Sequence, residues 1–284
     1  KPCGLGVMEA AEAIAKIADG RMAGAIRLVS IERGHDPAKF VAVPLGGGGA
    51  LHAGALIKDV GLQAALVPRY PGVTSALGCV IADIRHDQVQ TVNLTVEALD
   101  TDMLDRRMVE EAEAARNIVE EAGLPIDVID LVFELDMHYV GQTHTVAVPL
   151  PVTIENGSTG VTRDIVQAAF DAAYQASFSR LLPGLQAKIV NLRTSAIGRR
   201  PHFSLAALAP EPGTTVEQAK LGNRQVWFDG GWHDTTIYAR LDLPVGAVID
   251  GPAILEQPDA TVLVDPDLTA RVDEFGNVIM ERKA

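Results

Sequence analysis

The chain has 284 residues and a formal net charge of −13 at pH 7, with 48% hydrophobic and 5% aromatic residues. This length predicts about two domains, and the excess of acidic groups disfavours a nucleic-acid or anionic-membrane partner. No apolar run reaches the length of a membrane span, no signal peptide is visible, and Cys3 and Cys79 are too few for a disulfide framework, so we expect a cytoplasmic protein.

The first thirty residues predict helices. Apolar residues recur at helical spacing from Val7 to Ile17 and again from Met22 to Val29, which is typical of two consecutive amphipathic helices. The chain starts at Lys1 without an initiator methionine, and the first helical pattern is already under way at Val7. We therefore expect the chain to be part of something larger.

The stretch from Val41 to Pro68 combines a short apolar run, four glycines, a helical pattern closed by Gly61, and a second apolar run at Ala64–Val67. It predicts two parallel strands joined by a glycine loop and a crossover helix. Glycines have no Cβ, so the loop can come close to a ligand, and the following helix offers unpaired N–H groups to an anion. The candidate binding residues are Gly46, Gly47, Gly48, Gly49 and His52.

Two common nucleotide-binding loops do not fit this stretch. A phosphate loop ends in Gly-Lys-Ser/Thr, where this chain has Ala50 and Leu51. The dinucleotide fingerprint is broken by Leu51 or His52, and Arg69 stands where an acidic residue is needed. A nucleotide or phosphate site of another type remains, with a ligand-free tight turn as the alternative.

The middle of the chain, residues 89–198, predicts an α+β section. Its clearest elements are a long charged helix from Leu104 to Ala122 and a strand of strict alternation from Val128 to Tyr139. Further elements are expected at Gln90–Leu94, at Thr145–Leu150, in a helix capped by Thr162, and at Ile189–Ile197.

From about Arg199 the prolines and glycines separate short apolar strands, with hairpin turns expected at Asp229-Gly230-Gly231 and around Gly276. This pattern predicts a small all-β module over 199–284. The sequence therefore predicts three consecutive domains, 1–88, 89–198 and 199–284, of mixed α/β and α+β class.

Two other groups of polar residues are candidates for a catalytic pair or a metal site. Arg85-His86-Asp87 puts a carboxylate beside an imidazole, but neighbouring strand residues point to opposite faces, so a structural or interface role is favoured. Asp136 and His138 share a strand face, and His144 follows the next turn. A metal site there depends on how that turn places the third ligand.

The motifs occur in an order that resembles one protein family. The series comprises E-R-G-H-D-P at 32–37, the glycine loop with L-H-A at 51–53, V-P-R-Y-P-G-V-T-S-A-L-G at 67–78, A-D-I-R-H-D at 82–87, Y-V-G-Q at 139–142 and G-P-A-I-L-E-Q at 251–257. It resembles the hydantoinase A/oxoprolinase family over nearly the whole chain. The chain departs from the family's F-G-G-A-G-P-L-H-A, which here is L-G-G-G-G-A-L-H-A at 45–53, and Ala260 replaces a threonine of the last motif.

The resemblance implies that residues 1–88 form the second lobe, which is the C-terminal half, of an actin-like ATPase core. It implies ATP as cofactor, with Mg²⁺ held mainly by an N-terminal lobe whose D-x-G-G-[ST] motif does not occur in this chain. No metal is expected in this chain, because family members that need one are thought to hold it in the partner subunit. The catalytic residues are not assigned.

The activity that the resemblance implies is the ATP-dependent opening of a cyclic amide: hydantoin, oxoproline or a lactam. The carbonyl oxygen of this small-molecule substrate is phosphorylated, and water then opens the ring. The implied partners are the N-terminal lobe of the same subunit and a hydantoinase B-type subunit, so the chain alone would be inactive. A subunit of a ketone carboxylase and a non-catalytic assembly module are the alternatives.

Overall fold

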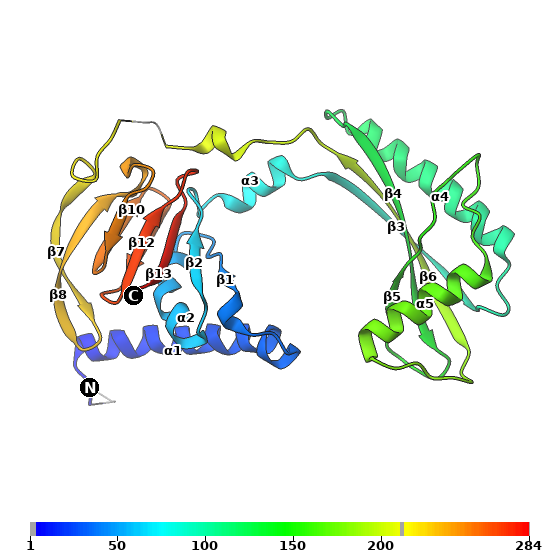
Figure 1. Cartoon of the computed structure of the whole chain (residues 1–284), viewed down its shortest axis with the longest axis horizontal. Helices are drawn as coiled ribbons and strands as arrows, with labels where there is room; N and C mark the ends of the chain where they lie inside the picture. Colours follow the sequence, from blue (N-terminus) through cyan, green and yellow to red (C-terminus); the bar gives the residue numbers. More distant parts are fainter. Residues whose placement is uncertain (1–3, 211–212, 284) are drawn as a thin grey trace. The chain divides into compact units, whose positions relative to one another are not determined.

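The structure, a computed structural model, describes residues 4–210 and 213–283. The chain divides into two compact units (Figure 1). Unit 1 combines the N-terminal part up to Val80 with the chain from Ser204 onward, and unit 2 comprises Ile81–Phe203. Cys3 lies outside the described residues, and Cys79 is an exposed free cysteine.

Unit 1 contains two β-sheets. The first sheet has the order β1-β2-β13-β12-β9, and the second has the order β11-β10-β8-β7. The strands are β1 (Val41–Ala42), β2 (Ala64–Val67), β7 (Lys220–Phe228), β8 (Gly231–Ala239), β9 (Val248–Asp250), β10 (Ala253–Gln257), β11 (Ala260–Val264), β12 (Leu268–Val272) and β13 (Val278–Arg282). The helices are α1 (Val7–Val29), α2 (Ala53–Val60) and α3 (Thr74–Ile81), with the short 3-10 turns η1 (Ile31–Arg33), η2 (Pro37–Lys39), η3 (Gly49–Leu51), η4 (Leu205–Leu208) and η5 (Arg240–Asp242).

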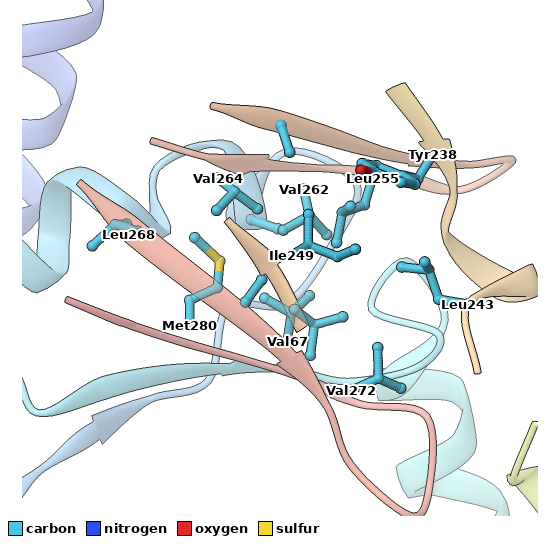
Figure 2. Packing of buried hydrophobic residues seen from close by; sticks show 14 of the residues in the cluster. Val67, Tyr238, Leu243, Ile249, Leu255, Val262, Val264, Leu268, Val272 and Met280 are labelled. Atoms are coloured by element: carbon cyan, nitrogen blue, oxygen red, sulfur yellow. The ribbon is translucent and has the colours of Figure 1, made fainter. Parts of the chain in front are cut away.

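The core of unit 1 is built from both ends of the chain. Figure 2 shows Val67 of β2 packed together with side chains from the C-terminal strands, among them Leu255, Val262 and Met280. β13 pairs antiparallel with β2, with Leu66 opposite Ile279. Apolar burial of this kind is the main stabilising contribution to a fold, so the N-terminal and C-terminal segments stabilise each other.

The pairing in unit 1 explains where the predicted domain boundaries differ from the structure. The sequence predicted a separate all-β module over 199–284, but three of its strands extend the sheet that β1 and β2 begin. Local patterns cannot reveal such a pairing, because β2 and β13 are far apart in the sequence. The predicted parallel pair is confirmed, since β1 and β2 run parallel with α2 between them.

Helix α1 is one continuous element where two helices were predicted. Only Asp19 and Ala23 of this helix are buried. Its apolar stripe is instead exposed to solvent, with Val7 at 85% and Ile14 at 71% of full exposure. Uncovered apolar stripes of this kind usually mark an interaction surface.

Unit 2 is one antiparallel sheet of order β3-β6-β4-β5 with two long helices. Its elements are β3 (Ile84–Thr95), α4 (Thr101–Glu121), β4 (Val128–Tyr139), β5 (Val146–Pro149), α5 (Arg163–Phe178) and β6 (Ala187–Arg199). The predicted alternation of β4 is confirmed, because Phe133, Leu135 and Met137 are buried in one cluster with side chains of α4 and α5. Thr162 caps α5 by accepting a hydrogen bond from the Ile165 N–H, at 3.2 Å.

Within the described residues, every helix is too short or too polar to cross a bilayer.

Candidate functional site

The glycine loop lies where the sequence predicted it, between β1 and the turn η3 that leads into α2. Gly46 has a φ of +78°, which favours glycine, and its N–H donates to the Pro71 carbonyl at 2.8 Å. The loop is therefore tied to the segment that follows β2. The glycine loop follows β1, and the segment with Pro71 follows β2. The two therefore meet at the carboxyl ends of two parallel strands, where α/β folds commonly bind ligands.

The next three glycines have different surroundings. A Cβ on Gly47 would lie 2.9 Å from the Asp259 carbonyl oxygen, and one on Gly49 would lie 3.4 Å from Pro44. A Cβ on Gly48 would meet nothing within 4 Å. Close packing therefore explains Gly47, whereas the distance at Gly49 is an ordinary contact and nothing in the described chain fills the space beside Gly48.

The N–H groups of Gly47, Gly48 and Gly49 donate no hydrogen bond to the described part of the chain. Gly47 and Gly48 are exposed and Gly49 starts the turn that leads into α2, so this part of the loop lies at the protein surface ahead of that helix. Such an arrangement can receive a polar ligand without moving other parts of the protein.

His52 has a partner inside the protein. Its Nδ1 lies 2.7 Å from an Asp19 carboxylate oxygen, and Asp19 is one of the two buried residues of α1. The pair joins α1 to the start of α2, which is a structural role. A direct contact of His52 with a ligand stays a prediction.

An apolar groove of about 590 Å³ lies beside β1. It is lined by the C-terminal end of α1, the segment 35–44 and part of α2. β1 is the end strand of its sheet, so its outer edge is unpaired in the described chain. The groove includes Val43 and Pro44, which lead directly into the glycine loop.

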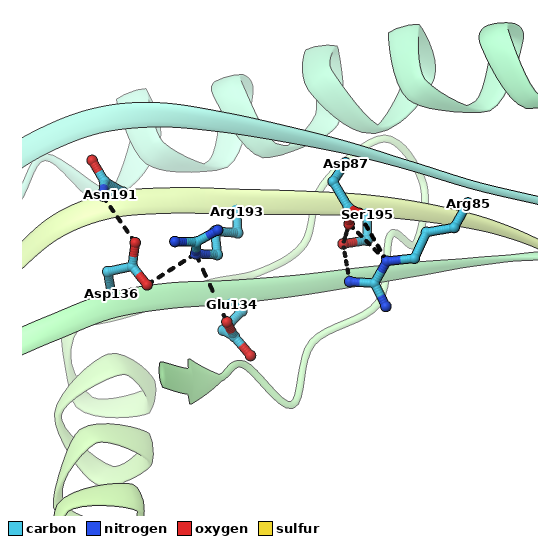
Figure 3. Close-up of polar contacts among 7 residues, drawn as sticks. All are labelled: Arg85, Asp87, Glu134, Asp136, Asn191, Arg193 and Ser195. Carbon is cyan, nitrogen blue, oxygen red and sulfur yellow. Dashed lines mark hydrogen bonds and ion pairs between the residues drawn. The ribbon is translucent and has the colours of Figure 1, made fainter. Parts of the chain in front are cut away.

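The polar groups singled out in unit 2 form ion pairs on one face of the sheet. Figure 3 shows Arg85 pointing at Asp87, with its Nε 2.9 Å from the carboxylate, and Ser195 between them. The Ser195 hydroxyl and the Arg85 guanidinium together lower the pKa of Asp87. His86 does not take part in this group, as expected from the alternation of strand residues.

Asp136 is held by two donors of β6, Asn191 and Arg193. It accepts hydrogen bonds from Arg193 Nε at 2.9 Å and from Asn191 Nδ2 at 2.8 Å (Figure 3). Burial raises its pKa, but these donors outweigh burial and keep the pKa below the ordinary value. His138 Nδ1 lies 2.7 Å from the Tyr139 carbonyl. In the ranges 4–210 and 213–283, no cluster of three or more His, Cys, Asp or Glu side chains is arranged to hold a metal ion.

Three residues around the glycine loop were not predicted as part of a site: Arg240, Gln257 and Asp259. Their contacts with the loop region join positions about two hundred residues apart. Gln257 ends the G-P-A-I-L-E-Q motif at 251–257, but no local pattern indicates what its side chain contacts. Arg240 follows an ordinary strand and carries no signal of its own.

The comparisons with known proteins agree with this fold. The family model described as hydantoinase/oxoprolinase matches residues 1–88, and the model of the hydantoinase/oxoprolinase C-terminal domain matches residues 98–282. The chain is 31% identical to an uncharacterized protein of Methanocaldococcus jannaschii, over 98% of this chain and 39% of that protein. It is 29% identical to the caprolactamase subunit alpha of Pseudomonas jessenii, over 96% of this chain and 39% of the subunit.

Similar coverage is found for other relatives. The acetone carboxylase beta subunit of Xanthobacter autotrophicus is 28% identical over 94% of this chain and 38% of the subunit. The crystal structure of ATP-dependent caprolactamase from Pseudomonas jessenii superimposes with a TM-score of 0.72 and 26% identity, covering 100% of this chain and 41% of that one. The chain thus spans about two fifths of the length of these relatives. With both family models matched in order along it, the chain belongs to the hydantoinase/oxoprolinase family.

Proposed function

We propose that the glycine loop binds the adenosine side of ATP, and that unit 1 contributes the second lobe of an actin-like nucleotide-binding core. The observation that carries this proposal is the open space beside Gly48 together with the unpaired N–H groups of Gly47, Gly48 and Gly49. Gly46 is explained by its positive φ and Gly47 by close packing, but the described chain gives no such reason for Gly48. A bound ligand supplies one.

The Asp259 carboxylate beside the loop favours the uncharged part of a nucleotide at this position. The Asp259 carboxylate accepts a hydrogen bond from the Gly72 N–H at 3.0 Å, and its own carbonyl lies against Gly47. A phosphate group next to this carboxylate would be repelled. We therefore assign the phosphates and Mg²⁺ to an N-terminal lobe outside this chain, and the adenosine to the loop.

The reaction that we propose for the whole enzyme is the ATP-dependent opening of a cyclic amide such as a lactam, with a hydantoinase B-type partner subunit. ATP supplies the phosphoryl group that activates the carbonyl oxygen. The caprolactamase relative supports this class of substrate. The acetone carboxylase relative supports ketone carboxylation as the second candidate. The chain alone is expected to be inactive.

The N-terminal lobe is the partner that we propose for the exposed stripe of α1, which comprises Val7, Ala11, Ile14, Ile17 and Leu28. These residues, the apolar groove and the free edge of β1 lie in one unit. The relatives are more than twice as long as this chain, so they have further residues available to cover such a surface.

The first prediction concerns this surface. The separately expressed N-terminal lobe is expected to form a complex with the chain, and Ile14→Asp should weaken that complex at least about tenfold, because it places a charge in an apolar contact. Light scattering and calorimetric titration measure both effects. The matched control is Val140→Asp, which changes an exposed valine of unit 2. A chain that stays monomeric in the presence of the lobe would refute the proposed partner.

The second prediction tests the nucleotide role with Gly48→Val in the complete subunit. Gly48 has a φ of −99°, which valine also adopts, and its side-chain direction is open. The loop should therefore keep its conformation, while the new side chain fills the space proposed for the ligand. We expect ATP binding to weaken about tenfold to a hundredfold, which corresponds to about 1.4–2.8 kcal/mol.

Gly48 is a sharper test position than Gly47. Gly47→Val is also expected to weaken ATP binding, but a Cβ there would press on the Asp259 carbonyl at 2.9 Å and disturb the protein's own packing. The control is Gly20→Val, since Gly20 is an exposed glycine of α1 with nothing within 4 Å of its Cβ position. Calorimetry measures the affinity and circular dichroism the fold. If folded Gly48→Val bound ATP as tightly as the wild type, the nucleotide role would be refuted. The glycines would then only form a turn, as expected for a non-catalytic module.

A further inference from the structure

The segment Val67–Gly72 starts at the last residue of β2 and is held by hydrogen bonds at every carbonyl from Val67 to Pro71. Arg240 donates to the carbonyls of Val67 and Pro68, and Gln257 donates to that of Arg69. The Thr74 hydroxyl donates to the Tyr70 carbonyl at 2.7 Å, and the Gly46 N–H donates to the Pro71 carbonyl. A loop with all its carbonyls paired has one preferred conformation.

Arg240 is the most deeply buried member of this group, at 3% of full exposure. Its guanidinium donates to Val67 at 2.9 Å and to the Gln257 side-chain oxygen, while its Nε finds no acceptor in the described chain. Burial lowers its pKa to about 10, so the group stays charged at neutral pH. A buried cation is costly unless hydrogen bonds satisfy it, and those of Arg240 are made to this segment and to Gln257.

Gln257 and Asp259 continue the network towards the glycine loop. The Gln257 amide donates to the Arg69 carbonyl at 3.2 Å and to one oxygen of Asp259. The other oxygen of Asp259 accepts from the Gly72 N–H at 3.0 Å. The Asp259 backbone carbonyl lies against Gly47, and the Pro71 carbonyl accepts a hydrogen bond from the Gly46 N–H. The turn between β10 and β11 thus contacts both loops at once.

We propose that Arg240, Gln257 and Asp259 are positioning residues, which fix the conformation of the glycine loop and thereby its affinity for the nucleotide. The second half of this inference rests on the proposed function of the loop. The residues act through the Val67–Gly72 segment and through the contact of Asp259 with Gly47, without touching the ligand themselves. The hairpin of β10 and β11 therefore supports the nucleotide site, although it is remote from the loop in the sequence.

The test uses Asp259→Ala in the complete subunit, with two measurements below the melting temperature. Hydrogen exchange of the Gly46 and Leu51 amides, which donate to the Pro71 and Gly48 carbonyls, should become at least about tenfold faster, because the Gly72 N–H and the Gln257 amide lose their acceptor. ATP affinity should fall about tenfold. Asp259→Asn should lose less ATP affinity, because its amide oxygen still accepts from the Gly72 N–H. The control is Asp250→Ala, which removes a carboxylate bonded to Thr269 elsewhere in unit 1.

The outcomes separate the two proposals. Unchanged loop exchange in Asp259→Ala would overturn the positioning role, whether or not the protein binds ATP. Faster exchange with unchanged ATP affinity would show that the network is purely structural, and would also overturn it. If the wild-type subunit bound no ATP, the proposed function would fail, while the exchange measurement would still decide whether these side chains fix the loop.

Discussion

Replacing Gly251 with alanine is expected to destabilise unit 1 by about 3 kcal/mol, because overpacking against backbone cannot be relieved by rotating a side chain. A Cβ at this position would overlap the Asp265 carbonyl and would lie 2.8 Å from the carbonyl oxygen of Val264. Two hydrogen bonds of the Gly251 backbone also hold this position in place. The Gly251 N–H donates to the Leu268 carbonyl at 3.0 Å, and Lys283 donates to the Gly251 carbonyl at 2.8 Å.

Denaturant unfolding followed by tryptophan fluorescence measures this effect. The chain has two tryptophans, Trp227 and Trp232, and both lie in unit 1. Gly20→Ala is the matched control, with open space at its Cβ position and an expected gain of up to about 1 kcal/mol from helix propensity. Amide protection in unit 2 should stay the same, since its sheet shares no strand with unit 1. An unfolding midpoint equal to that of the wild type would contradict the argument.

The elements that the sequence predicted well are those with a long local period. The charged helix α4 and the alternating strand β4 bury the expected side chains, because their apolar residues recur over at least ten positions. The stripe of α1 has an equally clear period, but it is exposed in this chain. Periodicity indicates which face of a helix is apolar, and it cannot say which partner covers that face.

The candidate site could be predicted only in its local part. The strand, glycine loop and helix are contiguous in the sequence, so their order identified the loop. Four consecutive glycines look equivalent in the sequence, yet Gly46 adopts a positive φ, Gly47 lies against the Asp259 carbonyl, and Gly48 has neither constraint. The network of Arg240, Gln257 and Asp259 was missed because it depends on the pairing of distant strands.

Unit 2 contains a buried carboxyl group that opposes stability at neutral pH. Glu111 of α4 is 5% exposed; one of its oxygens accepts from the Thr194 hydroxyl at 2.9 Å, and the other has no hydrogen-bond partner in the described chain. Burial raises the pKa of Glu111 above its ordinary value of 4.5, although Thr194 and Arg107 favour the ionised form. The folded protein therefore binds this proton more tightly than the unfolded chain does.

Glu111→Gln is expected to stabilise unit 2 at pH 7 by about 1–3 kcal/mol, because the amide keeps an acceptor for Thr194 without a buried charge. Since the folded pKa of Glu111 is raised, the wild type loses stability as pH rises from about the ordinary value of 4.5 to the raised pKa. Above that range the loss is complete, and below it Glu111 is neutral in both states. The stabilities of the two proteins should therefore converge near pH 4 and differ most at neutral pH.

Hydrogen exchange of the α4 and β6 amides across this pH range reports unit 2 separately from unit 1. A variant that is less stable than the wild type at pH 7, or a difference that does not shrink towards acid pH, would mean that Glu111 is stabilised in its ionised form.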